Sequence, residues 1–174
     1  MSQPPETAAP TVPDPAPAGA PAPGVSIVVP VLNEGRHLRE AVTALLQQEY
    51  AGPLEVVLAL GPSSDDTDAI AEQVAAADPR VTLVANPSGR TPSALNAAIG
   101  AAAHDVIVRV DAHAFVPLDY VAVAVETLER TGADNVGGIM AAEGETPFEH
   151  AVARAMTSKL GVGAASFHVG GEVL

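Results

Sequence analysis

Short apolar runs alternate along this chain with segments whose apolar residues recur at helical spacing. The strand-like runs are residues 25–30, 54–60, 81–84 and 106–110. The segments between these runs are long enough for the crossover connections that parallel strands need. Right-handed crossovers place the carboxyl ends of all strands at one edge of the sheet. We therefore expect an α/β domain with a Rossmann-like, mostly parallel sheet and helices on both faces.

The expected boundaries follow from turn and cap residues. Residues 1–24, rich in Pro and Ala, predict a disordered leader, and residues 25–174 the folded domain. Thr91 is expected to cap a helix with Pro92 in first position, and Pro117 to open another. Asp65 and Asp66 should cap the helix after the second strand. Further elements are expected at 135–140, a strand containing Gly137 and Gly138, and at 146–159, a helix.

Composition excludes several classes of function. A formal net charge of −13 argues against binding nucleic acid by phosphate neutralisation. The absence of cysteine excludes disulfides and thiolate chemistry. No apolar span approaches the roughly 18 residues of a membrane helix, and the N-terminus has no signal-peptide pattern. A cytoplasmic protein is the expectation from these features.

The run VIVRVDAH, residues 106–113, places metal-competent side chains directly after a strand. Because its apolar residues are nearly continuous, we expect a central strand covered on both faces. Asp111 and His113 then stand two residues apart at the strand's carboxyl end, where ligands bind in open α/β sheets. Together they could hold one cation that carries a phosphate, although an ordinary strand end with an Asp turn explains the same three residues.

The other loops at this edge also carry polar side chains. The loops after the strands are residues 33–35, 61–66, 86–90 and 111–114. They supply carboxylates, amides, one guanidinium and one imidazole, a set suited to a nucleotide with phosphates. No G-x-S-x-G elbow of a serine hydrolase is present, and the GxGxxG spacing of a dinucleotide-binding domain is missing.

Four motifs in order along the chain carry a family resemblance. They are VSIVVPVLNEGRHLREAVTALLQQ, LEVVLALGPSSDDT, NPSGRTPSALNAAI and VIVRVDAHA. This arrangement resembles the donor-binding half of family 2 glycosyltransferases with the GT-A fold, from residue 25 to about 138. The RVDAHA form is most similar to bacterial exopolysaccharide enzymes of the succinoglycan glucosyltransferase type.

The resemblance implies roles for individual residues. Pro30, Asn33 and Glu34 would line the nucleoside pocket. Arg90, with Asn96 of the ALN motif, would lie near the base or diphosphate. Asp111 would contact the ribose or a divalent metal, Mn²⁺ or Mg²⁺. His113 would replace the second aspartate of the family's D-x-D as a metal ligand.

Two departures from the family pattern stand out. Family members usually carry D-D-G-S after the second strand, where this chain has Leu60-Gly61-Pro62-Ser63, so nucleoside contact there would come from backbone or be absent. The family's catalytic base is an acidic residue, often in an E-D pair, in the acceptor-binding half. The only later acids here are Glu143, Glu145, Glu149 and Glu172. None stands in such a motif, so the catalytic base is unknown and the chain is expected to be truncated before the acceptor half.

The resemblance implies an inverting, metal-assisted transfer of sugar from a nucleotide-diphosphate donor, UDP-glucose or a relative, to a saccharide or lipid-linked acceptor. Peripheral membrane association would come through the missing C-terminal region. One alternative is a non-catalytic nucleotide-sugar-binding fragment. A nucleotidyltransferase is another, but LNEGRH fits poorly the glycine-rich, basic loop that such an enzyme needs after its first strand.

Overall fold

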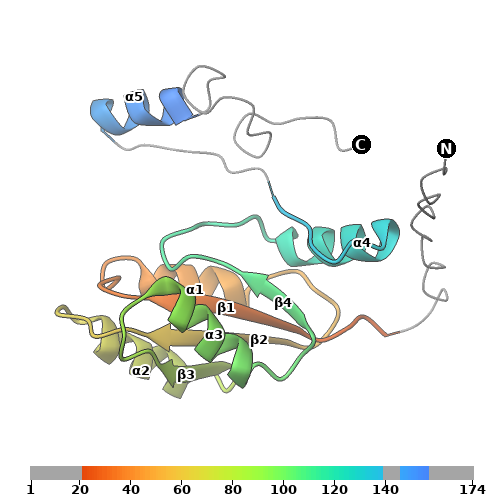
Figure 1. The fold of residues 1–174 in the computed structure, drawn as a ribbon, viewed down its shortest axis with the longest axis horizontal. Coiled ribbons are helices and arrows are strands. Elements are labelled where there is room, and N and C mark those ends of the chain that lie inside the picture. The colour runs from red at the N-terminus through yellow and green to blue at the C-terminus, as the bar shows by residue number, and fades with distance from the viewer. Residues whose placement is uncertain (1–20, 139–145, 157–174) are drawn as a thin grey trace, which may run out of the picture.

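The computed structural model describes residues 21–138 and 146–156. Within them lies a four-stranded sheet in the order β3-β2-β1-β4 (Figure 1). Its strands are β1 (Val25–Val31), β2 (Leu54–Leu60), β3 (Val81–Ala85) and β4 (Val106–Arg109). All three strand pairs are parallel, with Val25 opposite Leu54 of β2 and Val106 of β4. The predicted α/β fold with a parallel sheet is confirmed.

Helices connect the strands and cover both faces of the sheet. They are α1 (Leu38–Leu46), α2 (Thr67–Ala77), α3 (Thr91–Ala101) and α4 (Tyr120–Thr131), followed by α5 (Pro147–Met156). Buried residues of α1, α2 and α4 share one core with the sheet, whereas α3 packs on the opposite face. The connections β1-α1-β2 and β2-α2-β3 thus run on one side, and α3 returns the chain on the other to β4.

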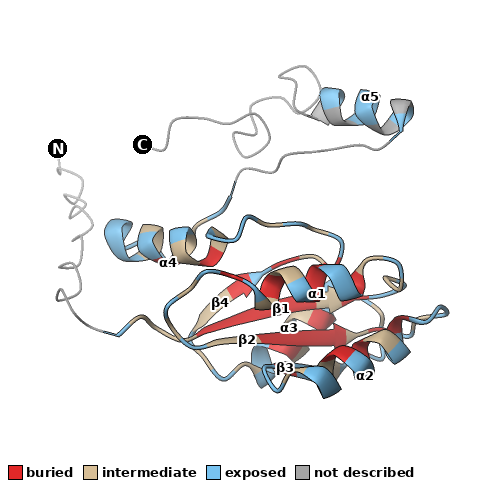
Figure 2. Cartoon of the chain, turned by 180° about the vertical axis from the view of Figure 1, so that it is seen from behind, coloured by how far each residue is buried: buried red, intermediate tan, exposed pale blue. Residues whose placement is uncertain are grey.

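The two cores follow from the alternation of side chains along each strand. On β1, Ile27 and Val29 join the core under α1, and Val28 faces α3. On β2, Leu58 belongs to the first core and Val57 to the second, and all of these side chains are at most 1% exposed. Figure 2 shows the buried residues gathered in β1 and β2 and on the helix faces that cover them. Continuous apolar runs therefore reflect burial on both faces.

A buried glutamine joins α4 to the rest of the domain. Gln48, just after α1, donates from Nε2 to the Pro117 carbonyl oxygen at 2.7 Å. Its Oε1 accepts from the Val121 amide, in the first turn of α4, at 3.0 Å. The neighbouring Glu49 amide donates to the Leu118 carbonyl oxygen at 2.7 Å. Because Gln48 satisfies both polar ends of its amide, it can be buried without an unpaired group.

β4, the strand that precedes Asp111, is at an edge of the described sheet and not at its centre. β4 pairs only with β1 among the described residues, and Val106 and Ile107 are half-buried. The prediction of a central strand is therefore wrong, although β4 contributes to the cores on both faces of the sheet through Val106, Ile107 and Val108. An apolar run indicates that helices cover a strand, but it does not indicate how many other strands flank that strand.

Three further boundaries differ from the sequence expectations. α4 begins at Tyr120, because residues 117–119 form a turn in which the Tyr120 amide donates to the Pro117 carbonyl. The N-cap of α3 is Arg90, which places Thr91 inside the helix. Residues 135–138 form no strand, and the remainder of that predicted strand, 139–140, lies outside the described residues.

The ends of the chain are described only in part. Most of the predicted leader, residues 1–20, lies outside the described residues, as do 157–159 of the last predicted helix. The Pro23 carbonyl oxygen accepts a hydrogen bond from the Tyr50 hydroxyl at 2.6 Å, so the last leader residues contact the domain. In the portion of the chain that is described, no helix is long and apolar enough to cross a membrane.

We predict that Leu58→Ala lowers the free energy of unfolding by about 2–5 kcal/mol, because it opens a cavity in the core of the central strands. Leu118→Ala is the matched control: its side chain is exposed, and we expect a change within about 0.5 kcal/mol. Urea denaturation followed by circular dichroism measures both. Equal losses in the two variants would contradict the assigned core.

Candidate functional site

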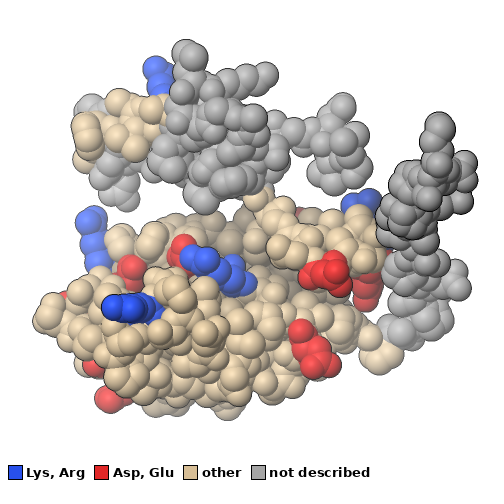
Figure 3. Space-filling model, in the orientation of Figure 1, with Lys and Arg blue, Asp and Glu red and all other residues tan. Residues whose placement is uncertain are grey.

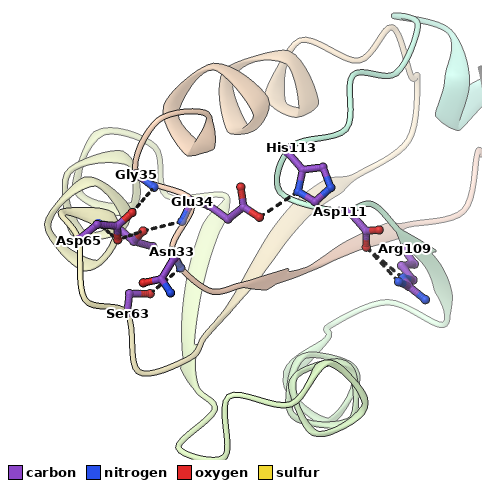
Figure 4. Close-up of polar contacts among 9 residues, drawn as sticks. Asn33, Glu34, Gly35, Ser63, Asp65, Arg109, Asp111 and His113 are labelled. Atoms are coloured by element: carbon purple, nitrogen blue, oxygen red, sulfur yellow. Dashed lines mark hydrogen bonds and ion pairs between the residues drawn. The ribbon is translucent and has the colours of Figure 1, made fainter. Parts of the chain in front are cut away.

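The loops that follow the four strands lie at one edge of the sheet, because all strands are parallel. We call this edge the rim, made of residues 32–37, 61–66, 86–90 and 110–116. Figure 4 shows the first, second and fourth of these loops contributing polar side chains to the same region. The sequence prediction that the polar loops share one edge is confirmed.

The loops after β1 and β2 are joined through Asn33. Its Oδ1 accepts hydrogen bonds from the Ser64 amide at 2.8 Å and the Ser64 hydroxyl at 3.2 Å. Its own amide donates to Ser63 Oγ at 3.0 Å. Asn33 has a φ of 55°, a left-handed conformation that asparagine tolerates better than most residues. The residue predicted to line a nucleoside pocket therefore also fixes the shape of two rim loops.

A second set of contacts joins the same loops one residue further along. The Glu34 amide donates to Thr67 Oγ1 at 2.8 Å, and the Gly35 amide donates to Asp65 Oδ2 at 3.0 Å. A Cβ at position 35 would meet the Asp66 side chain, so any other residue here would displace that carboxylate. The backbone of residues 33–35 is thus held at three consecutive amides.

Asp65 connects this loop to the start of α2. Its Oδ1 accepts from the Thr67 amide at 3.1 Å and also from the Thr67 hydroxyl. The Thr67 hydroxyl, and then the Gly35 and Thr67 amides, hold the pKa of the Asp65 carboxyl below its usual value. Asp66 occupies the N-cap position but makes no side-chain cap bond, so of the two expected caps only Asp65 supplies a carboxylate to the helix.

The loop after β3 is organised by a buried asparagine. Asn86 is 4% exposed, and its Oδ1 accepts from the Ser88 hydroxyl at 2.8 Å. Its Nδ2 donates to the Arg90 carbonyl oxygen at 3.3 Å. Gly89 has a φ of 64°, which favours glycine. Asn86 therefore shapes the loop that presents Arg90, and its side chain is already occupied within that loop.

The fourth loop places Asp111 and His113 with different partners. Asp111 Oδ1 accepts from Arg109 Nε at 3.2 Å and Nη2 at 3.1 Å. His113 Nδ1 lies 2.9 Å from Glu34 Oε1 of the β1 loop. Figure 4 shows the two contacts on separate sides of the loop, so the structure brings together Glu34 and His113 rather than Asp111 and His113.

The other predicted site residues are Pro30, Arg90 and Asn96, which lie on or next to β1 and α3. Pro30 is half-buried near the end of β1, opposite Ala59 of β2. Arg90 is exposed at the N-terminus of α3. Asn96 is exposed on α3, and within the described residues it forms no hydrogen bond to any rim loop. The contact between Glu34 and His113 could not be predicted from the sequence, because 79 positions separate the two residues.

Asp111 and His113 offer donor atoms of kinds that bind a divalent cation together with a phosphate, but among the described residues no contact joins the two side chains. No group of three or more His, Cys, Asp or Glu residues in the described ranges is arranged to hold a metal. Asp111 Oδ2 and His113 Nε2 accept no hydrogen bond from the described residues. Two protein ligands plus diphosphate oxygens and water form a normal coordination set for Mg²⁺ or Mn²⁺.

The described surface has no continuous basic patch on the face shown in Figure 3, where basic and acidic side chains are scattered and some lie side by side. At the rim itself, Arg109 faces Asp111 in an ion pair whose side chains are 55% and 43% exposed. Such exposed ion pairs stabilise a fold only weakly, so rearranging this one when a ligand binds would cost little free energy.

In open parallel α/β sheets, ligands bind at the carboxyl ends of the strands, which is where the polar loops of this domain lie. The family described as Glycosyl transferase family 2 matches residues 26–166. The chain belongs to glycosyltransferase family 2, as its four motifs predicted.

Two curated relatives are bacterial. The chain is 38% identical over 146 residues to the succinoglycan biosynthesis protein ExoA of Rhizobium meliloti, covering 83% of this chain and 44% of that protein. It is 33% identical over 116 residues to an N-acetylglucosaminyltransferase of Mesorhizobium japonicum, covering 64% of this chain and 27% of that protein. The chain thus spans less than half the length of either relative.

Solved structures share the fold. Staphylococcus aureus TarS residues 1–349 in complex with UDP match with a TM-score of 0.56 and 20% identity, covering 71% of this chain and 40% of that one. The mannosyltransferase PcManGT of Pyrobaculum calidifontis, in complex with GDP-Man and Mn²⁺, matches with a TM-score of 0.56 and 26% identity, covering 82% and 42%. The predicted GT-A type of fold is confirmed.

We predict that Asp65→Asn lowers the urea midpoint at pH 7 and that the difference from wild type disappears under acid conditions. The folded pKa of Asp65 is depressed, so its carboxylate stabilises the fold above the unfolded value of about 4. That stabilisation is lost as the pH falls through the lower, folded pKa. Denaturation curves between about pH 7 and pH 3 measure it.

Glu72→Gln, at an exposed position on α2, is the control and should show little change at any pH. A midpoint difference for Asp65→Asn that persists unchanged at the acid end would contradict the role assigned to the carboxylate.

Proposed function

We propose that this protein is the donor-binding part of an enzyme that transfers a sugar from a nucleotide-diphosphate sugar to a saccharide or lipid-linked acceptor in polysaccharide synthesis. The observation that carries the proposal is the rim, where loops of all four strands meet and D-x-H follows β4. The relatives named for succinoglycan biosynthesis and N-acetylglucosaminyl transfer support it.

The proposed donor is a UDP-sugar. The two solved relatives hold UDP in one case and GDP-Man in the other, which supports a nucleotide donor of this class. Pro30 and Asn33 would line the nucleoside pocket from the β1 side. Because Leu60-Gly61-Pro62-Ser63 offers no carboxylate there, nucleoside contact would fall to Asn33, the serines and backbone groups. Arg90, with Asn96 further along α3, would face the base or diphosphate.

Asp111 and His113 would hold a divalent cation, Mn²⁺ or Mg²⁺, through the Oδ2 and Nε2 atoms described above. PcManGT in complex with Mn²⁺ supports a metal of this kind. When bound, such a cation neutralises charge on the leaving diphosphate. Arg109 would keep the Asp111 carboxylate oriented through Oδ1, which leaves the other oxygen to the metal or the ribose.

The proposed transfer inverts the anomeric carbon, as the family resemblance implies. A single displacement uses a general base, the carboxylate of an acidic residue, to remove the proton of the acceptor hydroxyl. Glu143, Glu145 and Glu172 lie outside the described residues, and the side chain of Glu149 is not described either. The part of the reaction that we assign to described residues is therefore donor binding, and the catalytic base is left unassigned.

We expect that UDP binds the 174-residue chain with higher affinity in the presence of Mn²⁺ and that Asp111→Ala removes this gain. Asp105→Ala is the matched control, since it removes an exposed aspartate at the opposite end of the same strand and should bind as wild type does. Isothermal titration calorimetry with UDP and UDP-glucose measures the affinities. UDP binding that changes neither with Mn²⁺ nor with the Asp111→Ala substitution would contradict the proposed metal site.

A further inference from the structure

The contact between Glu34 and His113 connects loops that follow two adjacent strands. His113 Nδ1 lies 2.9 Å from Glu34 Oε1, within hydrogen-bond distance. The Glu34 side chain is 18% exposed, whereas that of His113 is 63% exposed. The imidazole therefore extends into solvent from a more sheltered carboxylate (Figure 4).

A carboxylate can only accept hydrogen bonds, so the contact requires a hydrogen on His113 Nδ1. In the neutral ring the lone pair is then on Nε2. Histidines that bind metals usually donate their second ring nitrogen to a carboxylate or carbonyl, which fixes both tautomer and ring orientation. Glu34 and His113 form the histidine–carboxylate half of this arrangement.

The backbone that carries the Glu34 side chain is held in place by neighbouring residues. The Glu34 amide donates to Thr67 Oγ1, and the amides on either side, of Asn33 and Gly35, donate to Ser63 and Asp65. Thr67 is fully buried at the start of α2. The carboxylate is thus attached to a segment held at three points, which suits it to orient a more exposed partner.

We propose that Glu34 is a positioning residue that holds His113 in the Nδ1–H tautomer and so leaves Nε2 as the ligand atom for the metal of the donor site. This rests on the proposed function for the metal itself. The proposed role of Glu34 differs from the nucleoside contact that the family resemblance implies. Glu34 acts through His113 and need not touch the donor.

The tautomer is measured by ¹⁵N–¹H correlation spectra of the histidine-labelled chain under mildly alkaline conditions. The signals of His113 are those that disappear in His113→Gln. Wild type should show a protonated Nδ1 and an unprotonated Nε2. Glu34→Ala should shift His113 toward the Nε2–H tautomer that an unconstrained imidazole prefers. Glu34→Gln, whose amide can donate as well as accept, should give an intermediate population.

The second readout is the affinity for UDP with and without Mn²⁺. Loss of a partner that orients a metal ligand typically lowers metal affinity 10–100-fold. In Glu34→Ala, the increase in UDP affinity caused by Mn²⁺ should therefore be smaller than in wild type by about that factor. UDP affinity without metal should stay near the wild-type value. Glu40→Ala, which removes an exposed acid in the first turn of α1, controls for the change in net charge.

Several results would overturn the proposal. One is a wild-type His113 with Nε2 protonated; another is a Glu34→Ala chain with unchanged tautomer and unchanged Mn²⁺ dependence. If Glu34→Ala weakened UDP binding equally with and without metal, Glu34 would be a nucleoside contact instead. A wild-type chain that shows the Nδ1–H tautomer but no Mn²⁺ effect on UDP binding would contradict the metal function, and the Glu34–His113 hydrogen bond would stand as a structural contact.

Discussion

The site depends on the parallel pairing of β1 with strands on both of its sides. Val25 of β1 is in register with Leu54 of β2 and Val106 of β4, so all three strands point the same way. Their loops consequently emerge at one edge, although their positions in the sequence are far apart. An antiparallel neighbour would place its following loop at the other edge and separate Glu34 from Asp111 and His113.

Much of the fold could be predicted from sequence, because burial on both faces produces apolar runs that few other structures require. The strands at 25–31, 54–60 and 81–85 agree with the prediction to within a residue. The edge position of β4 could not be predicted, since helices bury its side chains much as they bury those of a central strand. The start of α4 was also missed, because Pro117 is equally suited to a first helical turn and to the preceding turn.

The candidate site was predictable as a set of residues but not as a set of contacts. Asn33, Glu34, Asp111 and His113 stand in recognisable motifs after their strands, and the structure places all of them at the rim. Which of them meet depends on loop geometry. Asp111 pairs with Arg109 two residues away, while His113 crosses to Glu34. The loop between β1 and α1 is shaped by Ser63, Ser64, Asp65 and Thr67, whose hydrogen bonds no motif specifies.

We propose that the carboxyl edge of this sheet binds the donor nucleotide. Amide chemical-shift mapping of the chain titrated with UDP and Mn²⁺ tests this proposal, because each loop gives its own signals. We predict shifts at Asn33, Ser64 and His113 and none around Ser26, Glu55 and His104, which are joined by hydrogen bonds at the opposite edge. Shifts confined to that opposite edge, or spread evenly over the surface, would contradict the account.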